Sequence, residues 1–340
     1  METRGNRNLW LVGLLALTFS LRAHAVITLP PKSKCADIQT TINSLPSAGG
    51  SILIPAGKYI CGRPIIIDRN NVTLRGDGPA TKLVLGAHAN SPLLIIGQAS
   101  NEPTVTRSNI VISDLSFDGN RANQDYECWK NNCASVRNNG VSVRRANDVV
   151  LERLTTRRAR SGGVVIEKGS RRVTVRDLES SENSFDGLAM YQTEDSIFSG
   201  LLLHDNCYAG LSLDLGFNNN IISDVQIFRG PGAGPACGAG GFGKVGVFMR
   251  ESTRNVLRGL HIHNTREHGI FIADGPTGPA TKNIFSNLIV TGIVDATMNG
   301  IRVNDSTCVD NALDASILSD NEGSDISESA PLVRGDVSIY

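Results

Sequence analysis

The sequence predicts an all-β fold, a parallel β-helix in which the chain winds into stacked coils. Three observations lead to this prediction. A glycine followed by alternating apolar residues returns at nearly constant spacing, a second alternating segment precedes each glycine, and no helical period competes with them. A fixed period of a few tens of residues is typical of solenoids, whose units stack on their neighbours.

The glycine phrase occurs seven times and is clearest in FDGLAM and YAGLSL. The steps between successive phrases are 23, 24, 23, 36, 23 and 31 residues, so one coil takes about 23 residues and two coils carry insertions. Two reasons for the glycine stay open: a side chain would crowd the coil, or the backbone needs a positive φ. The phrases are centred on Gly140, Gly163, Gly187, Gly210, Gly246, Gly269 and Gly300.

A second apolar segment precedes most of these glycines. Val, Ile and Leu alternate with polar residues there, as half-buried strands require. Two or three such strands per coil would each stack about 4.8 Å from their equivalents in the next coil. The segments read VVLERLTT, VTVRDLES, SIFSGLLL, IISDVQIF, NVLRGLHI and NIFSNLIV.

The two ends of the chain differ from the coils. Residues 1–25 combine two arginines, an apolar run and a small-x-small site, which predicts a secretory signal peptide. Residues 26–340 are expected to form one domain. In it, residues 35–47 place apolar side chains at helical spacing and would cap the first coil, because an open solenoid exposes a sheet edge. Residues 306–340 lack the glycine phrase and stay an unassigned last coil and tail.

The chain has seven cysteines, and export makes disulfides possible. No cofactor is predicted, because no Cys or His pair has zinc spacing backed by further ligands. Acidic side chains near Asp214 leave Ca²⁺ possible. The expected disulfides are Cys35–Cys61, Cys128–Cys133 and Cys207–Cys237, with Cys308 as the free thiol.

The formal net charge is zero, but basic residues gather in one part of the chain. Between residues 137 and 176 there are eleven Lys and Arg against three Asp and Glu. This zone suits an anionic partner, or it is a solvated face with scattered ion pairs. A nucleic acid is not favoured, because the zone lacks interleaved aromatics and the protein is expected to be exported.

Two stretches carry a family resemblance. The sequence IQTTINSLPSAGGSILIPAGKYICGRPIIIDRNNVTLRGDG resembles the opening of the pectate-lyase-like right-handed β-helix superfamily. The stretch ISDLSFDGNRANQ and the coils after it are similar to the catalytic modules of mannuronan C5-epimerases. The resemblance covers about residues 37–305. It implies right-handed coils and a role with carbohydrates.

The catalytic motifs of the resembling families are altered here. The epimerase stretch Tyr-Gly-Phe-Asp-Pro-His falls on residues 162–167, which read GGVVIE, and the epimerases' next aspartate falls on Tyr191. Asp186, His268 and Arg302 occupy places similar to polygalacturonase residues within their coils, but that family's second acid and its lysine are absent. The resemblance therefore indicates the fold and the substrate class more than the reaction.

The fourth residue after each glycine points outward and should form a row along one flank of the stack. Uronate chemistry needs a cation for the substrate carboxylate, a base for the C5 proton and an acid. A row of polar residues with no catalytic role is the structural alternative. The row reads Arg144, Glu167, Tyr191, Asp214, Arg250, Ala273 and Asn304, and its catalytic candidates are Glu167, Tyr191, Asp214 and Arg250.

Further candidates lie beside this row. Asp186 and His268 directly precede their glycines, and their alternatives are a turn residue and a surface histidine. His204 and His263 belong to a different outward row and are not expected at the site. The insertions 121–138 and 230–243 are expected to wall the groove, the second as a mobile lid. Substrate-binding candidates are Trp129, Tyr126, Arg144, Lys244 and Arg302.

Three functions remain open from the sequence. The favoured one is a secreted or periplasmic enzyme that acts on an acidic polysaccharide by lyase or epimerase chemistry. The second is a glycoside hydrolase of polygalacturonase type, which needs two carboxylates at the right separation. The third is a non-catalytic glycan-binding or cell-surface β-helix. The protein is expected to be a monomer with no membrane contact after signal cleavage.

Overall fold

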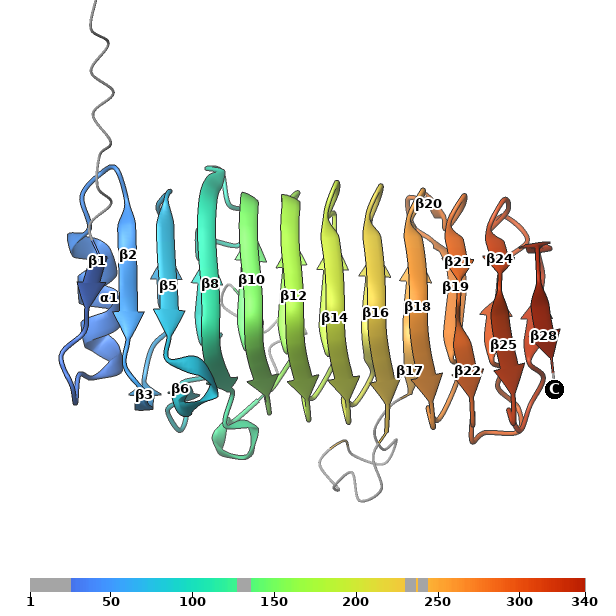
Figure 1. Ribbon diagram of the computed structural model, residues 1–340, viewed down its shortest axis with the longest axis horizontal. Coiled ribbons are helices and arrows are strands. Elements are labelled where there is room, and N and C mark those ends of the chain that lie inside the picture. Colours follow the sequence, from blue (N-terminus) through green and yellow to red (C-terminus); the bar gives the residue numbers. More distant parts are fainter. Residues whose placement is uncertain (1–25, 127–135, 230–236, 238–243, 340) are drawn as a thin grey trace, which may run out of the picture.

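Strands stack in parallel along the whole chain and form a right-handed β-helix (Figure 1). The computed structural model describes residues 26–126, 136–229, 237 and 244–339. The predicted signal peptide lies outside the described residues. No helix in the described part of the chain is long and apolar enough to cross a membrane.

One side of the stack is a 17-stranded sheet. Each of its long strands contains one or two residues with left-handed φ, such as Asp224 at 56°. Its strands are β1 (Val26–Thr28), β2 (Gly50–Ile54), β3 (Gly57–Cys61), β5 (Val72–Gly76), β6 (Thr81–Leu85), β8 (Arg107–Asp118), β10 (Ala146–Arg157), β12 (Arg171–Ser181), β14 (Ile197–His204), β16 (Ile221–Phe228), β18 (Val256–His263), β21 (Ile284–Ser286), β22 (Ile289–Thr291), β24 (Ala312–Asp314), β25 (Ser316–Ser319), β27 (Val333–Arg334) and β28 (Val337–Ile339).

The other side is an 11-stranded sheet, and seven of its strands begin at the glycine phrases. All are parallel except β20, which pairs antiparallel with β19. They are β4 (Ile65–Ile67), β7 (Leu94–Ile96), β9 (Val141–Arg144), β11 (Val164–Glu167), β13 (Leu188–Tyr191), β15 (Ala209–Asp214), β17 (Val245–Arg250), β19 (Ile270–Gly275), β20 (Gly278–Pro279), β23 (Ile301–Val303) and β26 (Ile326–Glu328). The tail left unassigned from the sequence forms a further coil.

The register of the 11-stranded sheet confirms the repeat. Val164 pairs with both Val141 and Leu188, so the glycines before them also stack. The same pairing continues through Leu211, Val247, Ile270 and Ile301. Inward side chains of both sheets fill a continuous apolar core, and the coil period found in the sequence is therefore the period of the structure.

Crowding explains the glycine phrase. None of its seven glycines has a left-handed φ. A Cβ at Gly163 would lie 2.1 Å from Ser180 Oγ, and a Cβ at Gly246 would lie 2.4 Å from the carbonyl oxygen of Gly269. The chain enters each strand so close to the neighbouring coil that a side chain cannot be placed there.

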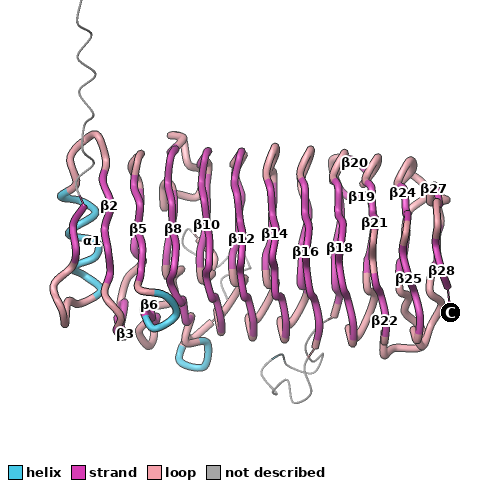
Figure 2. The backbone as a smooth tube through the Cα atoms, in the orientation of Figure 1, coloured by secondary structure: helices cyan, strands magenta, loops and turns pink. Residues whose placement is uncertain are grey.

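The N-terminal end of the stack is covered by the predicted cap. Helix α1 (Cys35–Ser44) lies across the first coil (Figure 2). Ile38, Ile42 and Leu45 are buried in the core, as their spacing predicts. Short 3₁₀ turns, η1 (Gly78–Ala80) and η2 (Arg121–Asn123), are the other helical elements of the described chain.

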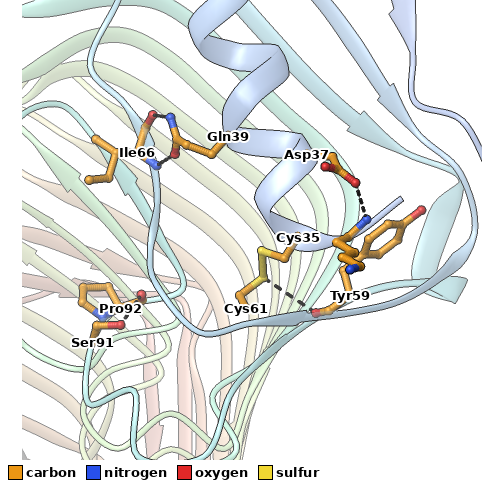
Figure 3. The surroundings of a disulfide bond; sticks show 9 residues. Cys35, Asp37, Gln39, Tyr59, Cys61, Ile66, Ser91 and Pro92 are labelled. Atoms are coloured by element: carbon orange, nitrogen blue, oxygen red, sulfur yellow. Dashed lines mark hydrogen bonds between the residues drawn. A yellow bond between two sulfur atoms is a disulfide. The ribbon is translucent and has the colours of Figure 1, made fainter. Parts of the chain in front are cut away.

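The side chain of Gln39 satisfies the free edge of β4, the first strand of the 11-stranded sheet. Its amide accepts a hydrogen bond from the Ile66 N–H at 2.6 Å and donates one to the Ile66 carbonyl at 3.1 Å (Figure 3). An amide side chain thus replaces the strand that would otherwise pair here. Nearby, the Cys35–Cys61 disulfide ties α1 to β3.

Replacing Gln39 with Ala should destabilise the cap. Both polar groups of Ile66 would lose their partner, which costs about 1–3 kcal/mol, and the opened edge would favour association. Urea unfolding and light scattering would measure the two effects. Thr40→Ala is the matched control, because the Thr40 hydroxyl bonds only its own helix at the Ala36 carbonyl. Equal stability of the two variants would contradict this role of Gln39.

The described cysteines follow two of the three predicted pairs. Cys35–Cys61 and Cys207–Cys237 form disulfides, and Cys308 is free and buried. The predicted Cys128–Cys133 pair lies outside the described residues. Disulfides close loops at the first coil and at the long insertion, where the repeat is interrupted.

Candidate functional site

The predicted outer row is present on the face of the 11-stranded sheet. Glu167 lies opposite Arg144, and Asp214 lies opposite Tyr191. The next pairs in register are Leu213 with Met249 and Arg250 with Ala273, so the row continues without a slip. Equivalent residues of adjacent coils are therefore neighbours along one flank.

The ionic residues of the row form two separate pairs. Arg144 Nε donates to Glu167 Oε1 at 2.7 Å. Two coils on, Arg250 donates to both Asp214 carboxylate oxygens, from Nε at 3.0 Å and from Nη2 at 2.7 Å. These hydrogen bonds to the Asp214 carboxylate raise the pKa of the Arg250 guanidinium. Tyr191 lies between the two pairs.

The guanidinium of Arg144 is buried and makes its hydrogen bonds within the protein. Its side chain is 2% exposed, and its Nη1 and Nη2 groups donate to the backbone carbonyls of Gln98, Ser100 and Asn101. A guanidinium with this many partners holds the loop before β8 against the sheet. The sequence could not reveal this, because those carbonyls belong to a loop more than forty residues earlier. Arg144 and its partner Glu167 therefore do not belong to the proposed reaction centre.

Asp186 and Tyr191 meet at the middle of the row. Asp186 is fully buried, and its Oδ1 accepts the Ala209 N–H at 3.1 Å. The Tyr191 hydroxyl lies 3.3 Å from Asp186 Oδ2 and donates to it. Asp186 lies just before β13 and Tyr191 is its last residue. Their side chains are five residues apart in the sequence but in contact in the structure.

Burial gives this pair unusual acidities. Desolvation raises the pKa of Asp186 to about 7, although the hydrogen bonds from Ala209 and Tyr191 act in the opposite direction. Desolvation also raises the pKa of the Tyr191 phenol well above its usual value, with the charge of Asp186 adding to the effect and a hydrogen bond to Ser212 opposing it. A buried carboxyl that titrates near neutrality is suited to proton transfer.

Arg137 is the cation that the sequence reasoning did not single out. Its charge lowers the pKa of both Asp186 and Tyr191, so it lies near both. Its side chain is exposed and, among the described residues, has no hydrogen bond or ion pair. Its place at the start of the basic zone was visible in the sequence, but its approach to Asp186 was not.

Most other cations of the basic zone are paired. Arg153 binds Asp114 and Glu152, and Arg172 binds Asp148. Ion pairs also join Arg157 and Arg158 to Asp118, Lys168 to Glu102, Arg171 to Glu194 and Arg176 to Glu152. The acids come partly from earlier coils, which the count along the sequence missed, so scattered ion pairs account for most of this zone.

His268 lies in the same row as Asp186, but three coils farther along. Its Nδ1 accepts the Asn299 N–H at 3.1 Å. Burial, followed by the charge of Arg302, lowers the pKa of the His268 ring. The neutral ring therefore carries its proton on Nε2, and it donates rather than accepts there. His268 is not a base for the Asp186 centre.

The remaining predicted binding residues are spread along the face. Lys244 Nζ lies 5.9 Å from the centre of the Tyr208 ring. Arg302 donates to the Ser327 hydroxyl in the last coils. Tyr126 is 43% exposed, whereas Trp129 and most of the insertion 230–243 lie outside the described residues. Lys244 thus contacts the ring of Tyr208, which stacks on Phe185, the residue before Asp186.

Stacked aromatic rings border the centre, and the sequence reasoning missed them. Phe185 and Tyr208 stack at 4.9 Å and 4°, and Phe248 and Phe271 stack at 5.7 Å and 12°. Their recurrence in the sequence could have revealed them, because aromatic residues stand two positions before or after the glycines of neighbouring coils. Cations lie over two of these rings, Lys244 over Tyr208 and Arg250 over Phe248.

The histidines of the second outward row lie on the 17-stranded sheet, as predicted. His204, Phe228 and His263 stack there at 5.1 and 5.0 Å. The described residues contain no group of three or more His, Cys, Asp or Glu side chains placed to hold a metal ion. Calcium remains an expectation from the sequence.

The family profile described as rhamnogalacturonase A/epimerase, pectate lyase-like, matches residues 32–240. Mannuronan C5-epimerase AlgE1 of Azotobacter vinelandii is 26% identical over 211 residues, which is 58% of this chain but only 14% of that relative. AlgE4 of the same organism is 27% identical over 187 residues, covering 52% of this chain and 33% of the relative.

Solved structures share the architecture. The A-module of AlgE4 superposes with a TM-score of 0.51 at 19% identity, over 90% of this chain and 95% of the module. An alginate lyase from Paenibacillus sp. str. FPU-7 gives a TM-score of 0.56 at 13% identity, over 92% of this chain and 99% of the lyase. At these identities the likeness concerns the fold alone.

Proposed function

Because the chain belongs to the rhamnogalacturonase A/epimerase, pectate lyase-like family, we propose that it acts on a uronate-containing polysaccharide by removing the C5 proton. The observation that carries this proposal is the contact between the buried Asp186 carboxyl and the Tyr191 hydroxyl. Relatives named as mannuronan epimerases and an alginate lyase support the substrate class. The disulfides fit a location outside the cytoplasm.

The residues of the centre divide the chemical tasks. Arg137 carries the open guanidinium that can bind the substrate carboxylate and acidify C5. Arg250, two coils beyond Tyr191, is held in place by both oxygens of Asp214. Asp186 is half ionised near neutral pH and accepts a proton through Tyr191. Burial keeps the Tyr191 phenol protonated. The phenol proton must therefore move to Asp186 as the C5 proton moves to the phenol oxygen.

The proton balance closes within this pair. As the Tyr191 proton passes to Asp186, the phenol oxygen takes the proton from C5. In a lyase, the C5–H electrons form the C4=C5 bond, the C4–O4 bond breaks, and Tyr191 gives the proton to O4. Asp186 then returns its proton to Tyr191. In an epimerase, water instead protonates C5 on its opposite face, and the hydroxide left behind takes the proton from Asp186, which restores the carboxylate.

The coil spacing fits a polymer lying along the helix axis. Each coil advances about 4.8 Å, close to the length that one pyranose adds to an extended chain. Side chains in equivalent places on neighbouring coils then meet equivalent groups on neighbouring sugars. Arg137 and Tyr191, which lie near each other, would thus address the reacting sugar, and Arg250, two coils beyond Tyr191, would address a sugar farther along the polymer.

Tyr191→Phe should lower turnover about 10³-fold and leave polymer binding nearly unchanged, because only the transferred proton is lost. Alginate and polygalacturonate would be assayed for absorbance of an unsaturated uronate and, in D₂O, for deuterium at C5. Tyr208→Phe is the control, since the Tyr208 ring packs against Phe185 in the neighbouring coil.

Two outcomes would contradict the proposal. New reducing ends without absorbance or deuterium uptake would indicate hydrolysis. Binding of the polymers with no product by either readout would indicate a glycan-binding protein without catalysis.

A further inference from the structure

A cationic pocket lies at the turns that follow β9, β11 and β13, beside the outer row. Its volume is about 400 Å³. We name it the turn pocket. Three cations and two carboxylates line it: Arg145, Lys168, Arg171, Glu102 and Glu194.

The cations of the turn pocket are placed by the same repeat that builds the outer row. Arg145 and Lys168 directly follow Arg144 and Glu167, and both have left-handed φ values, 47° and 62°. Because their coils are adjacent, the two backbone positions lie about 4.8 Å apart along the axis. The turn pocket therefore runs parallel to the row that holds Tyr191.

The ion pairs of the turn pocket lie at the surface, where an anionic ligand can replace their carboxylates. Lys168 binds Glu102 at 2.7 Å, but the Glu102 side chain is 80% exposed, and such surface pairs contribute little to stability. Arg171 binds Glu194 at 2.6 Å and is half exposed. Arg145 is exposed and, within the described chain, makes no side-chain hydrogen bond or ion pair. An incoming anion can therefore take the place of Glu102 and meet Arg145 as well.

We propose that the turn pocket binds a carboxylate of the acidic polysaccharide, on a sugar one or two units away from the reacting one. The identity of the ligand rests on the proposed function. The coils of Lys168 and Arg145 precede that of Tyr191 by one and two steps. A polymer with one sugar per coil brings the carboxylates of those units to the turn pocket.

Binding of polygalacturonate and alginate to Arg145→Glu tests the proposal, with the affinity measured at fixed salt. We expect about 10-fold weaker binding, equivalent to one strong contact. Arg258→Glu is the matched control, because Arg258 is an exposed arginine on the 17-stranded sheet. Both changes are made in an Asp186→Asn background, so that binding is measured without turnover.

The proposal would be overturned if Arg145→Glu left the affinity for both polyuronates unchanged, or if Arg258→Glu lowered it by the same factor. Dextran sulfate is the second ligand, and a larger loss for it than for the polyuronates would also overturn the assignment to carboxylates. Turnover by the wild-type protein is a separate measurement. If the proposed reaction is wrong, the wild-type protein will form no product. If the turn pocket does not bind the polymer, Arg145→Glu will leave the affinity unchanged.

Discussion

Asp186→Asn should abolish turnover and stabilise the folded protein above pH 7. Asparagine can still accept the Ala209 N–H and can donate to the Tyr191 oxygen, so the packing is preserved. It cannot accept a proton, and turnover should fall about 10³-fold or more. The buried Asp186 carboxyl that enables the reaction also lowers the free energy of unfolding once it is ionised.

The sign of the stability change follows from the pKa of Asp186. Burial raises it from 3.8 to about 7 in the folded protein. Between these values the folded state binds one proton more than the unfolded state, so the free energy of unfolding decreases as pH rises. The full effect, at most about 4 kcal/mol, is reached above pH 7. Asp186→Asn should match the wild type below pH 4 and exceed it increasingly up to pH 8.

Thermal or urea unfolding at pH 4, 6 and 8 would measure this divergence. Wild-type turnover should rise with pH through about 7, as Asp186 ionises. Asp224→Asn serves as control, because Asp224 is an exposed carboxyl at a strand bend of the 17-stranded sheet. A stability gap that does not grow with pH would refute the assigned acidity.

Gly163→Ala should destabilise the β-helix by about 3 kcal/mol or more. The added Cβ would lie 2.1 Å from Ser180 Oγ, 2.6 Å from Asn183 Nδ2 and 2.7 Å from the Gly187 carbonyl oxygen. Ser180 cannot yield easily, because it accepts from Thr156 and donates to the Gly187 carbonyl. Overpacking of this kind forces backbone shifts or lost hydrogen bonds.

The urea midpoint of Gly163→Ala would be compared with that of Gly62→Ala. Gly62 has no atom within 4 Å of its Cβ position and no left-handed φ, so its substitution should be nearly neutral. A small effect at Gly163 would mean that the coils can separate, and the explanation of the glycine phrase by crowding would fail.

The repeat could be read from the sequence in the seven coils with a glycine phrase, but not in the last coil, which contains β26. Each coil buries alternate apolar residues against the next coil, so periodicity along the chain becomes contact in space. The strand starts and the outer row follow from that rule, whereas the cap over Ile38 and Ile42 follows from their helical spacing. The pairings Cys35–Cys61 and Cys207–Cys237 followed from loops between regular segments.

The tertiary structure decided which members of the outer row are available for chemistry. Arg144 and Glu167 look like site residues in the sequence, yet backbone carbonyls of a distant loop consume the arginine. From the sequence Asp186 could be a catalytic or a turn residue, and its burial and its contact with Tyr191 favour the catalytic role proposed here. Periodicity fixes which residues are neighbours, whereas desolvation and the partners supplied by irregular loops fix their charge state, and neither is periodic in the sequence.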